Sequence, residues 1–240
     1  GEQKLEKCLR AVIKARHPQY VMVAGGCVAG VIGDNLEAVC RLVEEETKVP
    51  VLFTDGSGFM NDTESDPYLL TTKLLIEKFS PLKRTKEKDK TVVLLGEQPI
   101  NNKAFVNSCI NRLFHYFGFQ DVLFPIAGME ISEFPMLNRV SLAVAGRGQS
   151  NKRKEIHAYT RFFAETLGIP YNLDNLPETP EEVYAYLRKT GELLGEPFLA
   201  EKAIEQEKAM IQETVADCAP VFQKNTCLLA FVFSYDFKNT

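Results

Sequence analysis

Two periods alternate in the hydrophobic pattern of this chain. Apolar residues spaced three and four positions apart recur in several segments and indicate amphipathic helices. Short continuous apolar runs lie between them and are typical of strands buried on both faces. The pattern predicts helices at residues 5–13, 36–43, 67–79, 104–117, 152–167, 180–194 and 199–216. It predicts strands at residues 20–24, 49–53, 92–96, 122–126, 140–145 and 227–233.

This alternation of strand and helix predicts an α/β fold of parallel sheets flanked by helices. The polar stretch 80–90 is the best internal boundary. We therefore expect a first α/β subdomain at 1–85, which carries Cys27, and a second, Rossmann-like one at 86–220. The apolar run near the end would be the first strand of a truncated third subdomain, 221–240, so we infer that the chain is a fragment of a longer protein.

Composition narrows the class of protein. Apolar residues make up 45% of the chain and charged residues 25%, and the formal net charge is −4. This charge gives no footprint for nucleic acid, and we interpret the basic run 83–90 as a solvated linker. No apolar stretch approaches the ~20 residues that cross a bilayer. Six cysteines without CxxC pairs indicate a reducing, cytoplasmic setting. From the charge and the short apolar stretches we expect neither nucleic acid nor a membrane as partner.

Chemistry is concentrated in the segment Gly25–Glu37, where an apolar strand breaks into glycines and a cysteine before a helix. Cys27 would lie at the carboxyl end of a buried strand, where open α/β sheets bind ligands. A nearby helix N-terminus lowers the pKa of a thiol. Asp34 and Glu37 have the spacing of a capping box. From these residues alone, a nucleophile, a metal ligand and a plain turn cysteine all stay open for Cys27.

The remaining cysteines and the histidines do not complete a site. We expect packing roles for the other cysteines, which are Cys8, Cys40 and Cys109 on helical stripes and Cys218 and Cys227 near the end. A cysteine nucleophile needs an orienting histidine, and nothing selects His17, His115 or His157 as that base. Four closely spaced zinc ligands are absent from the sequence.

Glycine turns raise the question of a nucleotide. Gly146-Arg147-Gly148 follows a predicted strand and precedes a helix, as an anion-binding loop does. A tight strand-to-helix turn explains it equally well, since the dinucleotide fingerprint needs a third glycine and position 151 is Asn. The loop around Gly58 is similarly ambiguous. No GxxxxGK[ST] motif occurs, so we expect no ATP site.

The segment from Cys27 to Ala38 resembles the strand–Cys–loop–helix signature of nitrogenase component 1 proteins. These are the molybdenum–iron protein subunits, their cofactor-assembly paralogues and related tetrapyrrole reductases. The family pattern Ile-Gly-Asp-Asp is matched, with Asn35 at the second acid. Residues 49–59 look like the family's next strand and its cofactor-facing loop. The likeness continues to the end of the chain as order and spacing.

This resemblance implies subunits of three α/β domains that pair as α2β2-type assemblies with iron–sulfur clusters at their interfaces. Cys27 matches a cysteine that ligates the interface cluster, whose other ligands lie outside this chain. Electrons would come from a separate ATP-hydrolysing iron–sulfur reductase, and the second partner would be a homologous subunit. The candidate cofactor-binding residues are Gly26, Gly58, Gly146, Arg147 and Gly148.

The chain also departs from the family pattern. A cysteine follows the strand matching 140–145 in the catalytic molybdenum–iron subunit, whereas a glycine turn with Arg147 stands here. We therefore expect part of an oxidoreductase that receives electrons through a shared cluster, and no activity from the fragment alone. The alternatives are a metallocofactor-assembly scaffold without turnover and an unrelated nucleotide- or sugar-binding α/β protein.

Overall fold

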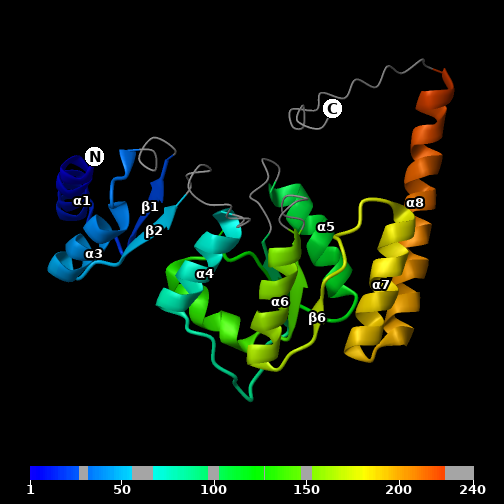
Figure 1. Ribbon diagram of the computed structural model, residues 1–240. Coiled ribbons are helices and arrows are strands. Elements are labelled where there is room, and N and C mark those ends of the chain that lie inside the picture. Colours follow the sequence, from blue (N-terminus) through cyan, green and yellow to red (C-terminus); the bar gives the residue numbers. More distant parts are fainter. Residues whose placement is uncertain (27–31, 56–66, 97–102, 127, 147–152, 225–240) are drawn as a thin grey trace.

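The computed structural model describes residues 1–26, 32–55, 67–96, 103–126, 128–146 and 153–224 (Figure 1). Its helices are α1 (Glu2–Arg16), α3 (Leu36–Thr47), α4 (Pro67–Phe79), α5 (Lys103–His115), the 3-10 helix η1 (Ile131–Arg139), α6 (Arg153–Leu167), α7 (Pro180–Leu194) and α8 (Pro197–Lys224). Its strands are β1 (Val21–Gly25), β2 (Val51–Asp55), β3 (Thr91–Leu95), β4 (Asp121–Leu123), β5 (Leu142–Ala145) and β6 (Tyr171–Asn172). The predicted α/β class with parallel sheets is confirmed.

The first sheet consists of β1 and β2, which pair in parallel from Val21 with Val51 to Gly25 with Asp55. Helices α1 and α3 cover one face of it, and Val43 of α3 is completely buried there. Alternate residues of a strand point to opposite faces. Accordingly, Val51 packs in this cluster whereas its neighbour Leu52 packs in another.

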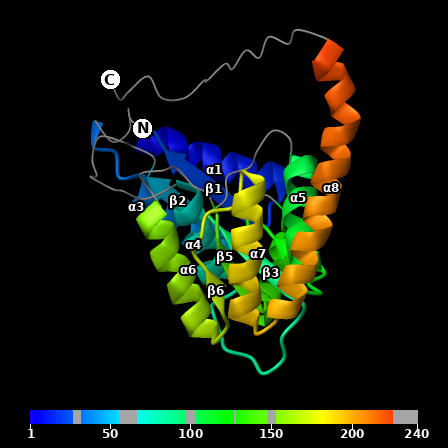
Figure 2. The same ribbon diagram turned by 90° about the vertical axis from the view of Figure 1, so that its right-hand side faces the viewer.

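The second sheet has the strand order β4-β3-β5-β6, and all its neighbouring strands are parallel. Its two faces alternate along β3 in the same way. Val93 and Leu95 pack with α4, η1 and α6, whereas Val92 and Leu94 pack with α5, α7 and α8. Figure 2 shows β6 between α6 and α7, at one edge of this layer.

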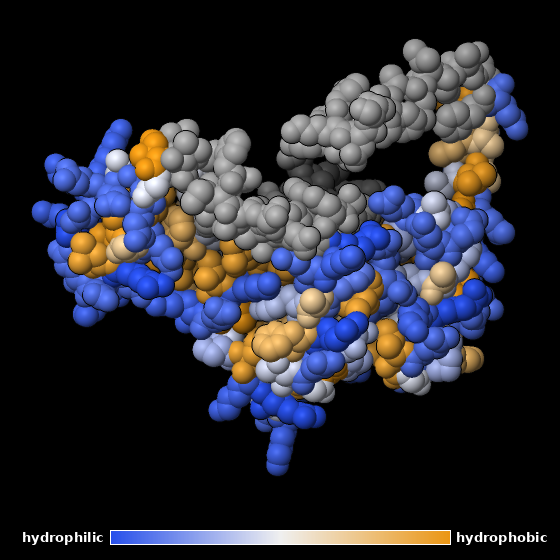
Figure 3. All heavy atoms as spheres, viewed as in Figure 1, coloured by the Kyte–Doolittle hydropathy of each residue, from blue (hydrophilic) through white to orange (hydrophobic). Residues whose placement is uncertain are grey.

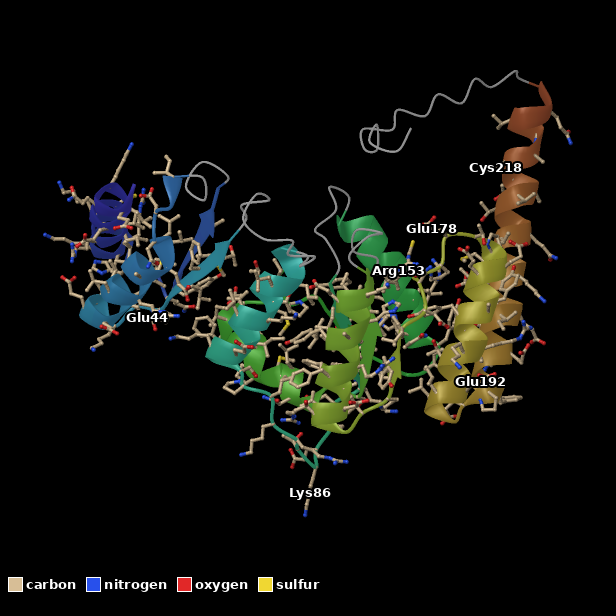
Figure 4. All side chains as sticks on the ribbon, viewed as in Figure 1. Glu44, Lys86, Arg153, Glu178, Glu192 and Cys218 are labelled. Carbon is tan, nitrogen blue, oxygen red and sulfur yellow. The ribbon has the colours of Figure 1, made fainter. Side chains whose placement is uncertain are left out.

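One apolar cluster joins the two sheets. Leu52 of β2 packs with Leu69, Leu75 and Ile76 of α4, and the same cluster contains Val93 of β3. Polar contacts reinforce this junction, because Glu44 of α3 (labelled in Figure 4) accepts a hydrogen bond from the Val51 amide at 2.8 Å and pairs with Lys78 of α4. Helix α4 therefore packs against both sheets, and the division of the chain into 1–85, 86–220 and 221–240 stays a prediction.

The predicted linker at 80–90 has no regular secondary structure and projects from the molecule as a hydrophilic tip (Figure 3), with Lys86 at its end (Figure 4). Asn138 of η1 holds its first part. The Asn138 amide nitrogen donates to Ser80 Oγ at 3.0 Å and to the Pro81 carbonyl at 3.3 Å, and its oxygen accepts from the Lys83 amide at 2.7 Å. The connection is therefore solvated but tied to the body.

Several sequence expectations are corrected by the structure. The cap of α3 is Asn35, whose side chain accepts from the Ala38 amide at 3.1 Å, so Asp34 and Glu37 do not form a capping box. The expected strand 122–126 is only the three-residue β4. The last helix continues to Lys224, through Pro220. The expected strand 227–233 and Cys227 lie outside the described residues.

The cysteines follow the expectation only in part. Cys40 is buried, as predicted, and Cys109 is half-buried. Cys8 is exposed, because α1 packs through the narrow stripe of Leu9 and Ile13 and Cys8 lies beside this stripe. Cys218 is also exposed on α8. Among the described helices none is long and apolar enough to cross a membrane.

Candidate functional site at the strand carboxyl ends

The candidate residues follow the carboxyl ends of parallel strands. Gly25 ends β1 opposite Asp55 of β2, and Leu95 of β3 pairs with Ala145 of β5. These ends lie on one side of the molecule, the upper side in Figure 1. Open α/β sheets bind their ligands at this edge. The turns that follow these strands are separate in the sequence, and the fold brings their starting points to the same edge.

At the end of β1 the backbone is open to approach. Gly25 is buried and Gly26 is exposed, and a Cβ atom built on Gly26 would meet no atom of the described residues within 4 Å. Cys27 follows directly and lies outside the described residues, as do Gly58, Arg147 and Gly148. The structure therefore places the strand end that carries Cys27, and the position of the thiol stays a prediction.

The chain is described again at Ile32, on the way into α3. The Ile32 side chain is 67% exposed, which is unusual for a large apolar residue. The turn then passes through Gly33 at a φ of +77°, a conformation that favours glycine. The backbone N–H of Asn35 donates to the Glu2 carboxylate of α1, with 2.8 Å between N and Oε1. This contact and the Asn35 cap fix where α3 begins, one turn after the glycine-rich segment.

A second glycine pair marks the middle of the other sheet. Helix connections leave β3 toward β4 and β5 toward β6, in opposite directions, so the sheet has a topological switch point between β3 and β5. There the Gly146 amide donates to the Leu95 carbonyl at 2.7 Å. The next residue after β3, Gly96, has a φ of +75°, and a Cβ atom on it would lie 2.8 Å from Ile156 of α6.

Gly96 is the residue that sequence reasoning missed. Its need for glycine comes from α6, which is far away in the sequence, and no local motif indicates it. A glycine thus directly follows each of the two strands at the switch point. Gly146, one of the predicted residues, is buried there.

Helix α6 brings charged groups to the same edge. Arg153 lies at the start of α6 and Glu178 lies on the segment before α7, near the upper ends of these two helices in Figure 4. One turn further along α6, burial lowers the pKa of His157, and the positive charges of Arg153 and Arg161 lower it further. The Asp174 carboxylate, just after β6, acts in the opposite direction. His157 is therefore held toward its neutral form, and it lies far along the chain from the Cys27 segment.

The described residues do not form a complete metal centre. They contain no group of three or more His, Cys, Asp or Glu side chains that could hold a metal ion. The glycines that follow β1, β3 and β5 therefore mark strand ends that do not by themselves hold a metal ion. Any metal site at this edge would need ligands from residues beyond the described ranges.

Comparison with known proteins identifies this arrangement. Residues 1–233 match the family described as "Nitrogenase component 1 type Oxidoreductase". Over 93% of the chain the fold superimposes on the solved structure "Nitrogenase Cp1 at pH 6.5", with a TM-score of 0.69 and 18% identity. The aligned part makes up 41% of that nitrogenase chain.

Curated relatives match over shorter segments. The nitrogenase iron-molybdenum cofactor biosynthesis protein NifE of Clostridium pasteurianum is 31% identical over 97 residues, which are 40% of this chain and 21% of the relative. The NifE of Klebsiella pneumoniae is 39% identical over 59 residues, covering 25% and 13%. The nitrogenase molybdenum-iron protein alpha chain of Methanosarcina barkeri is 31% identical over 77 residues, covering 32% and 14%.

The matched segments thus make up only 13–21% of the length of each of these relatives. The family expected from the Cys27–Ala38 signature is confirmed, and the alternative of an unrelated α/β protein is wrong. The match covers both described sheets and their helices. The chain belongs to the nitrogenase component 1-type oxidoreductase family.

Proposed function

We propose that this chain is part of a nitrogenase component 1-like oxidoreductase in which the Cys27 thiolate is one ligand of an iron–sulfur cluster shared with a homologous subunit. The protein would work in the cytoplasm and receive electrons from a separate ATP-hydrolysing iron–sulfur reductase. The observation that carries the proposal is the strand end itself. Gly25 and Gly26 bring the backbone to the ligand-binding edge of a parallel sheet directly before Cys27.

The surroundings of this strand end fit a shared group. Among the described residues nothing crowds Gly26, the residue before Cys27, and a cluster with a second subunit would need such room. The exposed Ile32 supplies an apolar surface of the kind that subunit interfaces cover. Within the described ranges no complete set of ligands exists, so a single thiolate from this chain would have to be completed by other ligands. The cluster would supply electron storage and transfer at the interface.

The residues of this chain would position and tune the thiolate. Gly25 ends β1 and Gly26 follows it without a side chain, so the backbone before Cys27 is open to close approach. Asn35 caps α3 and fixes where the chain enters this helix after the segment that carries Cys27. A thiolate near a helix N-terminus is favoured by the helix dipole. The segment that carries Cys27 is thus flanked on both sides by residues with defined positions, Gly26 before it and Asn35 after it.

Iron content tests the ligand assignment. Full-length protein, purified anaerobically with its partner subunit, should lose iron and the cluster's visible and electron-paramagnetic signals when Cys27 is changed to Ala. Cys8→Ala is the matched control, because Cys8 is an exposed thiol on α1 away from the sheet edge. Equal iron in the Cys27→Ala and Cys8→Ala assemblies would contradict the assignment.

A scaffold for metallocofactor assembly is the second candidate. It is favoured by the curated relatives, since NifE proteins of several organisms are named for biosynthesis of the iron-molybdenum cofactor. The glycine turn after β5, where Gly146 lies in place of a cysteine, agrees with this role. On this proposal the chain would hold a cofactor temporarily and pass it on.

Transfer and turnover distinguish the two functions. An oxidoreductase should reduce a substrate when the reductase and ATP are supplied. A scaffold should instead restore activity to a cofactor-free nitrogenase component 1 without turnover of its own. Cofactor release without electron uptake would favour the scaffold, and ATP-dependent reduction of the bound cluster followed by turnover would favour the oxidoreductase.

A further inference from the structure

The outer edge of β1 has no partner strand within the described residues. In a parallel pair, the backbone groups of successive residues point to alternate sides of the strand. The Val21 amide donates to the Pro50 carbonyl at 2.8 Å, so Val21 and every second residue after it point toward β2. The N–H and C=O groups of Met22 and Ala24 therefore point to the other side. There the described part of the chain offers them neither a strand nor a hydrogen-bond partner.

Such an edge is unusual for a parallel sheet. Parallel sheets are covered on both faces, and a free strand edge is a template for pairing with another segment. The side chains of residues 21–23 are half-buried and Ala24 is exposed, whereas Val51 and Leu52 of β2 are buried. The first sheet therefore lacks cover on the β1 side.

Helix α1 has the geometry of a crossover helix. Its first turn lies beside the first turn of α3, where Glu2 accepts the hydrogen bond from the Asn35 amide. Like α3, it therefore starts at the carboxyl edge of the sheet, and its last turn leads into the start of β1. Its 15 residues have the length of a connection between parallel strands, which need a crossover of a dozen or more residues. We therefore expect a strand parallel to β1 before α1.

Handedness places that strand. Crossovers between parallel strands of one sheet are right-handed in about 98% of cases. Two successive right-handed crossovers put their helices on the same face only when the chain crosses the sheet in one direction. Leu9 and Ile13 of α1 pack with Val39 and Val43 of α3, so the two helices cover the same face. A strand before α1 therefore belongs on the side of β1 away from β2, which is the open edge.

The exposed flank of α1 agrees with this position. Arg10 faces α3, because its Nε lies 2.9 Å from Glu46 Oε2. Val12 follows two residues later, about 200° further round a helix of 3.6 residues per turn. It is 40% exposed. An apolar side chain thus lies on the flank of α1 away from α3, where an added strand would cover it.

We propose that the open edge of β1 binds a parallel strand from the segment of the full-length protein that precedes Gly1 and leads into α1. Its residues would be mostly apolar, since parallel strands are buried on both faces. No proline would occupy a position that donates to the Met22 or Ala24 carbonyl. The turn from this strand into α1 would lie at the carboxyl edge and flank the segment that carries Cys27. The inference rests on the geometry of the sheet and needs no cluster.

Hydrogen exchange of single amides in the full-length protein tests this inference. The Met22 and Ala24 amides should exchange at least about 100-fold more slowly than an amide without a partner, as expected for hydrogen bonds inside a sheet. Lys86, exposed at the tip of segment 80–90, is the unprotected control, and Val23, which points toward β2, is the protected one. Rapid exchange of Met22 and Ala24 beside a protected Val23 would overturn the inference.

A proline substitution tests the edge by a second route. Ala24→Pro removes the outward N–H and leaves the ladder to β2 intact, so a free edge would tolerate it. With a strand bound, the variant loses a hydrogen bond and its ring meets the neighbouring backbone, so the urea midpoint should fall. Ala24→Ser keeps the N–H and is the matched control. Equal midpoints for the two variants would count against a bound strand.

A cross-link identifies the source of the strand. The photoreactive residue p-benzoylphenylalanine at position 12 should react with the same chain within about 12 residues before Gly1, the sum of a strand and a short connection. The same group at Leu42, 49% exposed on α3, should not. A cross-link from position 12 to the homologous subunit would overturn the assignment. Iron content is measured separately, so a failure here leaves the Cys27 proposal standing.

Discussion

Arg112 of α5 and Glu207 of α8 lie against each other, with the arginine Nε 2.8 Å from the glutamate Oε1. The Tyr116 hydroxyl donates to the same oxygen at 2.8 Å, and Glu207 is only 2% exposed. Burial, together with this hydrogen bond, raises the pKa of Tyr116 to about 12. The three side chains fix the long helix α8 to the C-terminal end of α5.

Removing the buried acid should therefore be costly. Glu207→Ala leaves Arg112 and Tyr116 without their partner and should lower the free energy of unfolding by about 2–4 kcal/mol. Urea denaturation measures it. Glu201→Ala is the matched control on the same helix, because its pair with Arg188 is exposed and should matter little. Equal losses in the two variants would contradict a special role for the buried contact.

The glycine after β3 should be irreplaceable for two separable reasons. Gly96→Ala combines an unfavourable φ of +75° with a clash against Ile156, and should cost about 2–4 kcal/mol. Gly118 has a similar φ of +77° but open space around it, so Gly118→Ala should show only the backbone part, about 1 kcal/mol. Chemical denaturation of both gives the difference. Similar losses would mean that α6 yields at Ile156.

Titration of His157 should make the free energy of unfolding depend on pH. Its folded pKa is lowered, mainly by burial, below the ~6.5 of an unfolded histidine. Between these two values the unfolded chain binds more protons, so the free energy of unfolding falls as the pH drops through this window. The contribution is complete above about pH 6.5, and its loss ends below the folded pKa.

A His157→Gln variant removes this titration. Its urea midpoint should fall less than that of the wild type between about pH 7 and pH 5. A comparison at about pH 8, where histidine is neutral in both states, corrects for the substitution itself. Parallel curves for the two proteins over the acidic range would contradict the assignment.

Thiol reactivity should separate the cysteines by burial. Cys8 and Cys218 are exposed and should react rapidly with iodoacetamide. Cys40 is 1% exposed, and burial, with the charges of Glu37 and Glu44, raises its pKa, so little thiolate is available. Peptide mass spectrometry over time measures each site. Labelling of Cys40 at the rate of Cys8 without unfolding would contradict this order.

Periodicity predicted the long elements because each has one broad apolar face against a sheet. The bounds of α4 and α7 agree with the prediction to the residue. The pattern could not find β6, since two residues are too short for any period and the strand exists only through its pairing with β5. It also missed η1, where Pro135 lies within the helix.

The candidate site was predictable only where chemistry is local. A glycine-glycine-cysteine turn after a strand is visible in the sequence, and so is the glycine after β5. The need for glycine at position 96 depends on Ile156 of α6, a segment far away in the sequence, so no local pattern could indicate it. The N-cap of α3 could not be predicted to the residue either. Asn35 and not Asp34 is the cap, because the helix begins at Leu36.

The apolar cluster that contains Leu52 of β2 and Val93 of β3 has a thermodynamic consequence. Two sheets that share a core cannot lose their packing one at a time without exposing the α4 face to water. We therefore expect calorimetry to record a single cooperative transition, although the sequence suggests a boundary at 80–90. A substitution that weakens the packing of one sheet should then also weaken the packing around the glycines at the strand ends of the other sheet.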